Sequence, residues 1–193
     1  MSFHHLALAT NDIEATHRFY TEVMGFDLVK AVVAETMEGG WARHVFYDTH
    51  GGGLMAFWDI HDEKLPAFDA SISTGLGLPA WTNHIAFNAA TLDDLAAMRN
   101  RWLDHGEKVV EIDHGWCTSI YTNDPNGIMV EFCTTTVAFT DADRSEAAAA
   151  LAAEQPELEA PPSVTFYDPE TESAPARPDP TPILASLRTR IGA

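Results

Sequence analysis

Two short segments of the chain carry a histidine at the same place in an apolar, alternating pattern. The first is His4-His5-Leu6-Ala7-Leu8, and the second is Asn83-His84-Ile85-Ala86-Phe87. A third ionisable residue, Glu131, lies in an apolar segment near residue 130. A carboxylate is costly to bury unless it is paired or ligated. Two imidazoles and one carboxylate that leave coordination positions open are the ligand set of non-haem Fe(II) and related divalent ions.

The alternation of side chains along a strand predicts that these three residues face the same way. In residues 3–9, His5 shares a face with alanines, whereas Leu6 and Leu8 share the other face. In the last segment, Glu131 shares a face with Met129 and Cys133, and the apolar residues around them face a helix. We therefore expect His5, His84 and Glu131 to meet on the concave side of a sheet as metal ligands.

The elements that must position these residues repeat along the chain. Each histidine segment is a predicted strand, and an amphipathic helix follows it, over 12–24 and 92–104 respectively. Three further strands follow each helix. They are predicted over 27–36, 41–48 and 54–59 in the first half, and over 107–113, 117–122 and 128–135 in the second. The fold class is therefore α+β, with two βαβββ units (2–60 and 82–136) that form a curved mixed sheet around a metal-binding cavity.

Composition limits the function classes. Hydrophobic residues make up 46% of the 193-residue chain, and the formal net charge is −18, which disfavours nucleic acid and anionic membranes as partners. No apolar run is long enough to span a bilayer, and no signal peptide is predicted. The two cysteines, Cys117 and Cys133, give no disulfide framework, so we expect a cytoplasmic protein.

Beyond residue 136 the composition changes. Residues 137–193 form an acidic extension rich in alanine and proline, with a helix predicted over 141–154 and a short one over 182–192. We expect this extension to wrap the surface or to dock a partner rather than to form a second core.

The motifs of residues 1–136 together resemble the vicinal oxygen chelate superfamily. The resemblance rests on the two βαβββ units, on His-Leu-Ala-Leu and His-Ile-Ala-Phe, and on the helix end Phe19-Tyr20 with Met24-Gly25-Phe26. It also rests on the run from Ser119 through Asp124-Pro125-Asn126-Gly127 to Glu131-Phe132. The superfamily includes glyoxalase I, fosfomycin-resistance transferases, methylmalonyl-CoA epimerase and extradiol dioxygenases. By this resemblance, His5, His84 and Glu131 are the metal ligands.

Departures from the family pattern favour one branch. Glyoxalase I and the epimerase have a fourth ligand where this chain has Ala56, so three ligands match the dioxygenases and fosfomycin transferases better. Tyr121 matches a tyrosine beside the metal in extradiol enzymes. The active-site histidine of those enzymes falls near Gly52, where His50 is the nearest substitute. His114, in the turn Asp113-His114-Gly115, is a candidate acid or base.

The sequence therefore predicts a metal-dependent enzyme, most simply an extradiol-type ring-cleaving dioxygenase with Fe²⁺, and with Mn²⁺, Ni²⁺ or Zn²⁺ as alternatives. Tyr121 and His114 are the predicted catalytic residues, and His50, Trp58 and Phe3 are the predicted substrate-binding residues. The alternatives are a glyoxalase-like lyase, isomerase or thiol transferase, and a non-catalytic ligand-binding module. The expected partners are a small-molecule substrate and a second copy of the chain, as a homodimer.

Overall fold

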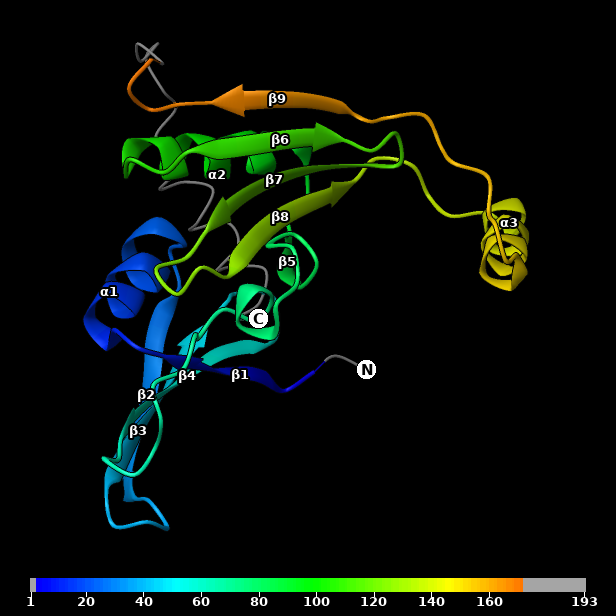
Figure 1. Ribbon diagram of the computed structural model, residues 1–193. Coiled ribbons are helices and arrows are strands. Elements are labelled where there is room, and N and C mark those ends of the chain that lie inside the picture. Colours follow the sequence, from blue (N-terminus) through cyan, green and yellow to red (C-terminus); the bar gives the residue numbers. More distant parts are fainter. Residues whose placement is uncertain (1–2, 172–193) are drawn as a thin grey trace.

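The computed structural model describes residues 3–171, and its strands form two sheets (Figure 1). The first sheet has the order β1-β4-β3-β2, from β1 (His5–Thr10), β2 (Asp27–Glu35), β3 (Trp41–Asp48) and β4 (Leu54–His61). The second has the order β5-β8-β7-β6-β9, from β5 (His84–Asn88), β6 (Val109–Asp113), β7 (Cys117–Asn123), β8 (Met129–Thr135) and β9 (Ser163–Tyr167). Both βαβββ units are present, although they form two mixed sheets rather than the one curved sheet that we expected.

The two sheets have the same internal register. His5 on β1 lies opposite Leu54 on the parallel strand β4, and His84 on β5 lies opposite Met129 on the parallel strand β8. Two residues further along, Ala56 and Glu131 therefore occupy equivalent positions. The same comparison makes Phe46, opposite Ala56, the counterpart of Tyr121, opposite Glu131. The repeat is thus a structural one, but only the second half has the carboxylate and the tyrosine.

The helices follow the predicted order, with one irregularity. α1 (Ile13–Arg18) passes into a π-helical turn, η1 (Phe19–Val23), in which the Met24 amide donates to the Phe19 carbonyl at 2.9 Å. Gly25, at φ +76°, ends this turn. A wider turn brings Phe19, Tyr20 and Val23 into the core together. η2 (Thr74–Leu76) lies in the connector, and α2 (Leu92–Asp104) has the predicted bounds. No helix within residues 3–171 is long and apolar enough to cross a membrane.

One core joins the two halves on the helix side of both sheets. Phe57 from the first half, and Trp102 and Ile120 from the second, are completely buried in it. A polar contact fixes the halves to each other, because the buried Tyr20 hydroxyl donates to the Asp124 carboxylate at 3.1 Å. Asn126, in the same turn, accepts from the Thr10 hydroxyl at 2.9 Å. On the opposite faces of the two sheets, His5, Ala7, His84 and Ala86 remain exposed.

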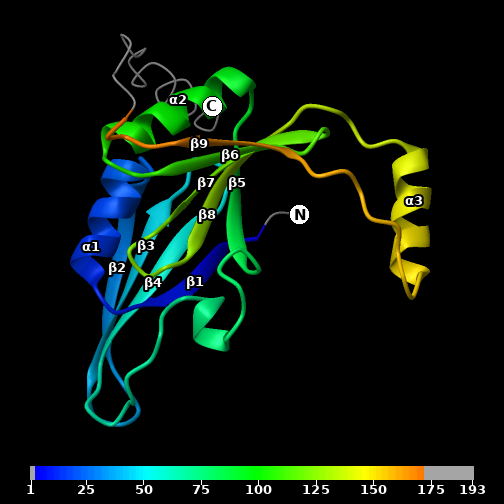
Figure 2. The same cartoon turned by 45° about the horizontal axis from the view of Figure 1, so that its top comes forward.

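The C-terminal extension contains a strand that the sequence analysis missed. α3 (Asp141–Ala152) has no buried residue and lies apart from both sheets in Figures 1 and 2. The chain then returns, and β9 pairs antiparallel with β6 along the edge of the second sheet. Among the described residues, the first sheet has no such strand, and all nine residues of its edge strand β2 are exposed. The helix predicted over 182–192 lies outside the described residues.

Candidate functional site

Two of the three predicted metal ligands are in direct contact. His84 begins β5 and Glu131 lies in the middle of β8, and their Nε2 and Oε2 atoms are 3.0 Å apart. The Glu131 side chain is 7% exposed and that of His84 is 37% exposed, so the pair lies at the bottom of an opening to solvent. Two ligand atoms that are each about 2.1 Å from an ion, at a right angle, are roughly 3.0 Å apart. The observed separation fits two adjacent ligands of one ion.

The hydrogen bond on the far side of His84 supports this interpretation. His84 Nδ1 lies 3.2 Å from the Trp81 carbonyl oxygen, which can only accept, so Nδ1 carries the proton. In neutral imidazole, Nε2 then presents its lone pair to the Glu131 carboxylate, which is also an acceptor. Two acceptors at 3.0 Å need a proton or a cation between them. The fixed tautomer is the one that a metal-binding imidazole needs.

Tyr121 and His114 lie beside this pair. Tyr121 is directly opposite Glu131 across β7 and β8, and its ring centroid is 6.2 Å from that of His84. Its hydroxyl lies 3.2 Å from His114 Nε2. Burial, with a smaller effect of the Glu131 charge, raises the pKa of Tyr121 to about 12. The phenol therefore keeps its proton at neutral pH and can donate a hydrogen bond.

A cavity of about 350 Å³ opens over these residues. Its lining is mainly apolar, and His84, His114 and Tyr121 are joined there by four residues that the sequence analysis did not propose: Trp81, Val110, Ile112 and Met129. Val110 and Ile112 could have been found, because alternation along β6 puts them on the face of Tyr121, which pairs with Val110. Trp81 comes from the connector, which has no periodic pattern.

His5, the third predicted ligand, lies on the other sheet. Its Nδ1 is 2.8 Å from His4 Nδ1, and its ring contacts those of His44 and Phe46 at centroid distances of 6.1 and 5.5 Å. Within residues 3–171, no three side chains of His, Cys, Asp or Glu are close enough together to hold a metal ion. The structure thus brings together His84 and Glu131 but does not add His5 to them.

Two predicted substrate-binding residues also belong to the first half of the chain. Trp58 is 37% exposed and stacks on His44 at a centroid distance of 3.9 Å. Burial and the neighbouring His5 lower the pKa of His44, so this ring favours the neutral form. The Phe3 ring covers Gly53, where a Cβ atom would lie 2.8 Å from the ring. Trp58 and Phe3 therefore lie in the half of the chain that carries His5, apart from the cavity over His84.

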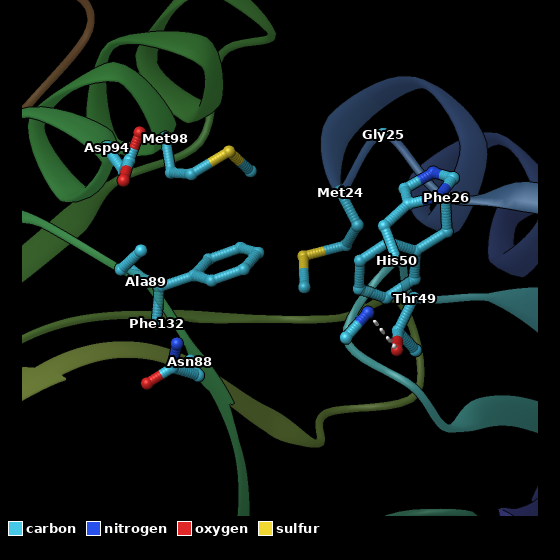
Figure 3. Close-up of a pocket in the computed structure, with 12 residues that line it drawn as sticks. Met24, Gly25, Phe26, Thr49, His50, Asn88, Ala89, Asp94, Met98 and Phe132 are labelled. Atoms are coloured by element: carbon cyan, nitrogen blue, oxygen red, sulfur yellow. Dashed lines mark hydrogen bonds between the residues drawn. The ribbon is translucent and has the colours of Figure 1, made fainter. Parts of the chain in front are cut away.

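His50, the third predicted substrate-binding residue, does not lie in the cavity over His84. It has a left-handed backbone, at φ +59°, and its Nε2 atom lies 3.6 Å from the Asp27 carboxylate. Figure 3 shows it beside Met24 and Phe26, facing Met98 and Phe132 across a pocket between the two halves. This pocket shares no lining residue with the cavity over His84. The glycine loop does not bring His50 to the His84–Glu131 pair.

Comparison with known proteins defines the class. Residues 2–132 match the family model of the glyoxalase/bleomycin resistance protein/dioxygenase superfamily. This match covers more than half of the chain, so the protein belongs to that superfamily, as the sequence motifs predicted.

Individual relatives show the range of the family. The chain is 33% identical over 131 residues to biphenyl-2,3-diol 1,2-dioxygenase 3 from Rhodococcus globerulus, which covers 66% of this chain and 60% of that protein. It is 23% identical over 133 residues to glyoxylase I 4 from Arabidopsis thaliana, which covers 68% of this chain and 70% of that protein. A solved glyoxylase/bleomycin resistance protein/dioxygenase domain from Frankia sp. EAN1pec has the same fold. Its TM-score is 0.53 at 15% identity, over 70% of this chain and 98% of that domain.

Proposed function

We propose that the protein is a metal-dependent enzyme of the extradiol dioxygenase type, which acts on a small substrate with two adjacent oxygen atoms. The observation on which this proposal depends is the His84–Glu131 pair, whose Nε2 and Oε2 atoms are 3.0 Å apart, with His84 lining an apolar cavity. The 33% identity to a dioxygenase supports the reaction class, although the chain spans only 60% of that relative. Ala56, at the position equivalent to Glu131, favours a three-ligand site over the four-ligand isomerases.

The ligands in this proposal are His84, Glu131 and His5, with Fe²⁺ as the ion. When bound, such an ion would act as a Lewis acid toward the substrate oxygens and would supply the chemistry with O₂.

The protein's own side chains have three roles in this proposal. Tyr121 donates a hydrogen bond toward the substrate oxygens, because its pKa of about 12 keeps the phenol protonated. His114, whose Nε2 atom lies 3.2 Å from that hydroxyl, takes up the proton that the bound diol releases and returns it to the ring-opened product. Trp81, Val110 and Ile112 surround the substrate with apolar surface and exclude water.

His5 reaches this site in a homodimer. Among the described residues of one chain, His5 lies on a different sheet from His84 and Glu131. The strands β1 and β5 are both at sheet edges, and both have exposed residues. We propose that the β1 edge of one copy lies against the β5 edge of its partner, so that each site takes His5 from one chain and the other two ligands from the second.

Oxygen consumption tests the reaction. Protein loaded anaerobically with Fe²⁺, then given a catechol and O₂, should consume O₂ and form a yellow ring-opened product. Glu131→Ala should abolish both signals, and Glu159→Ala, an exposed acid of the extension, should leave them unchanged. The absence of oxygen uptake over a broad panel of catechols would refute the dioxygenase assignment. Activity with Ni²⁺ and a glutathione adduct would instead favour the glyoxalase branch.

A further inference from the structure

A groove opens on the helix side of the first sheet, between α1 and the edge strand β2, which lie beside each other in Figures 1 and 2. Its cavity of about 460 Å³ is larger than the one over His84, and it is within the usual range of small-molecule sites. Leu28 and Ala31 of β2 line it, and they pair with Tyr47 and Val45 of β3. The first half therefore has a cavity of its own on the helix side of its sheet.

The interior of this groove is apolar. Val45 and Tyr47 form a buried floor, and Leu28 and Ala31 form one wall. The Tyr47 hydroxyl lies 3.1 Å from His17 Nδ1, so the polar atom of the floor already has a partner. Burial raises the pKa of Tyr47 to about 12, so this phenol is uncharged at neutral pH. The interior therefore favours an apolar group of a ligand.

The second half shows what such a groove can hold. There β6 is the strand equivalent to β2, and Tyr167 of β9 lies opposite Val109 of β6. The Tyr167 ring packs against the core, and the guanidinium of Arg99 on α2 lies 4.6 Å from its centroid. An aromatic ring thus lies between helix and edge strand in the second half. Among the described residues, no fifth strand brings a ring to the first.

Two charged side chains of α1, Glu14 and Arg18, also line the groove. A Glu and an Arg four residues apart on a helix usually form an ion pair. Within residues 3–171, however, neither of these side chains has an ion pair or a hydrogen bond. The other arginine of the lining, Arg43, is already bound to Asp59 at 2.6 Å. The groove therefore has one free carboxylate and one free guanidinium, about 6 Å apart along the helix axis.

We propose that this groove binds a free α-amino acid with an aromatic side chain. The Glu14 carboxylate accepts hydrogen bonds from the ammonium group, the Arg18 guanidinium donates to the carboxylate, and the ring lies against Leu28 and Ala31. A zwitterion complements both charges, whereas a simple anion or cation leaves one of them unmatched. The groove is on the face of the first sheet opposite to His5, so this inference does not depend on the proposed metal chemistry.

Binding of L-phenylalanine to the metal-free full chain, measured by calorimetry and by NMR titration, tests the site. The wild-type protein should bind it with a Kd of about 1 mM or lower. N-acetyl-L-phenylalanine lacks the ammonium group, and L-phenylalaninamide lacks the carboxylate. Each should bind at least about tenfold more weakly, the effect of losing one charged partner.

Variants of the groove locate the ligand. Glu14→Gln and Arg18→Gln should each weaken L-phenylalanine binding at least about tenfold, because each removes one charged partner. Ala31→Phe keeps both charges and should abolish binding, because the new ring fills the groove. Lys30→Gln is the matched control and should change the affinity less than twofold, since Lys30 pairs with Phe46 on the opposite face of the same sheet.

Three results would overturn the inference. The first is the absence of L-phenylalanine binding to the wild-type protein. The second is equal affinity for L-phenylalanine and either of its two derivatives, which would show that one end of the zwitterion is not recognised. The third is binding that persists in Ala31→Phe but is lost in Glu131→Ala, which would place the ligand in the cavity over His84.

Discussion

At the scale of single residues, the proposed chemistry depends on which groups hold protons beside His84 and Glu131. Tyr121 keeps its proton, because burial raises its pKa to about 12, and its hydroxyl lies 3.2 Å from His114 Nε2. We expect Tyr121→Phe to lower kcat about 100-fold, the usual effect of losing one proton-handling group, and to leave the iron content unchanged. Steady-state oxygen uptake and iron analysis of the same samples measure both. A loss of iron in this variant would show that Tyr121 supports the metal site rather than the reaction.

A second residue-scale prediction concerns the contact between Tyr20 and Asp124. Burial raises the pKa of Asp124, so this carboxyl stabilises the folded state below its unfolded pKa, and that contribution is lost as the pH rises through its folded pKa. The hydrogen bond from Tyr20 opposes this effect, because it stabilises the ionised form. Tyr20→Phe should therefore lower the free energy of unfolding by about 1–2 kcal/mol at neutral pH and by less near pH 4. Urea unfolding at both pH values measures the difference, and an equal loss at both would contradict the assignment.

At the scale of elements, the side-chain contacts that hold β9, in addition to its backbone pairing with β6, should come from its helix-side residue. Tyr167 has its hydroxyl 3.2 Å from Arg99 Nη1 and its ring over the same guanidinium. We expect Tyr167→Ala to lower the free energy of unfolding by about 2 kcal/mol and to speed hydrogen exchange in β9. Phe166→Ala, the matched variant on the exposed face, should cost less than about 0.5 kcal/mol. Equal effects of the two variants would mean that β9 is not anchored through Tyr167.

The elements also show why the sequence predicted some features and not others. Alternation and turn residues placed β3 and α2 at their observed bounds, since each is bordered by glycine or a capping residue. The π-turn at Phe19 was missed because its apolar spacing is the same as that of an α-helix. β9 was missed because its alternating Val164 and Phe166 are surrounded by proline and acidic residues. The alternation of side chains along a strand predicted that His84 and Glu131 share a face. Alternation does not indicate whether His5, on the other sheet, lies close to them.

At the scale of the whole molecule, two similar halves have acquired different roles. The second half keeps the carboxylate and the tyrosine, while the first has Ala56 and Phe46 at the equivalent positions. In the proposed site, the first half contributes the His5 imidazole, and the second contributes His84, Glu131 and the cavity. Two copies related by a two-fold axis would give two equal sites, each with ligands from both chains.

Anaerobic dialysis against Fe²⁺, with iron measured per chain, tests this account most directly. The wild-type protein should bind about one ion per chain, and His5→Ala, His84→Ala and Glu131→Ala should each bind less than about a tenth of that, because the remaining ligands no longer offset desolvation of the ion. A 1:1 mixture of His5→Ala and Glu131→Ala, co-refolded, should recover about a quarter of an ion per chain, since half of the dimers regain one intact site. Wild-type iron binding by Glu131→Ala would contradict the metal site, and a mixture that binds no more than its components would contradict the shared one.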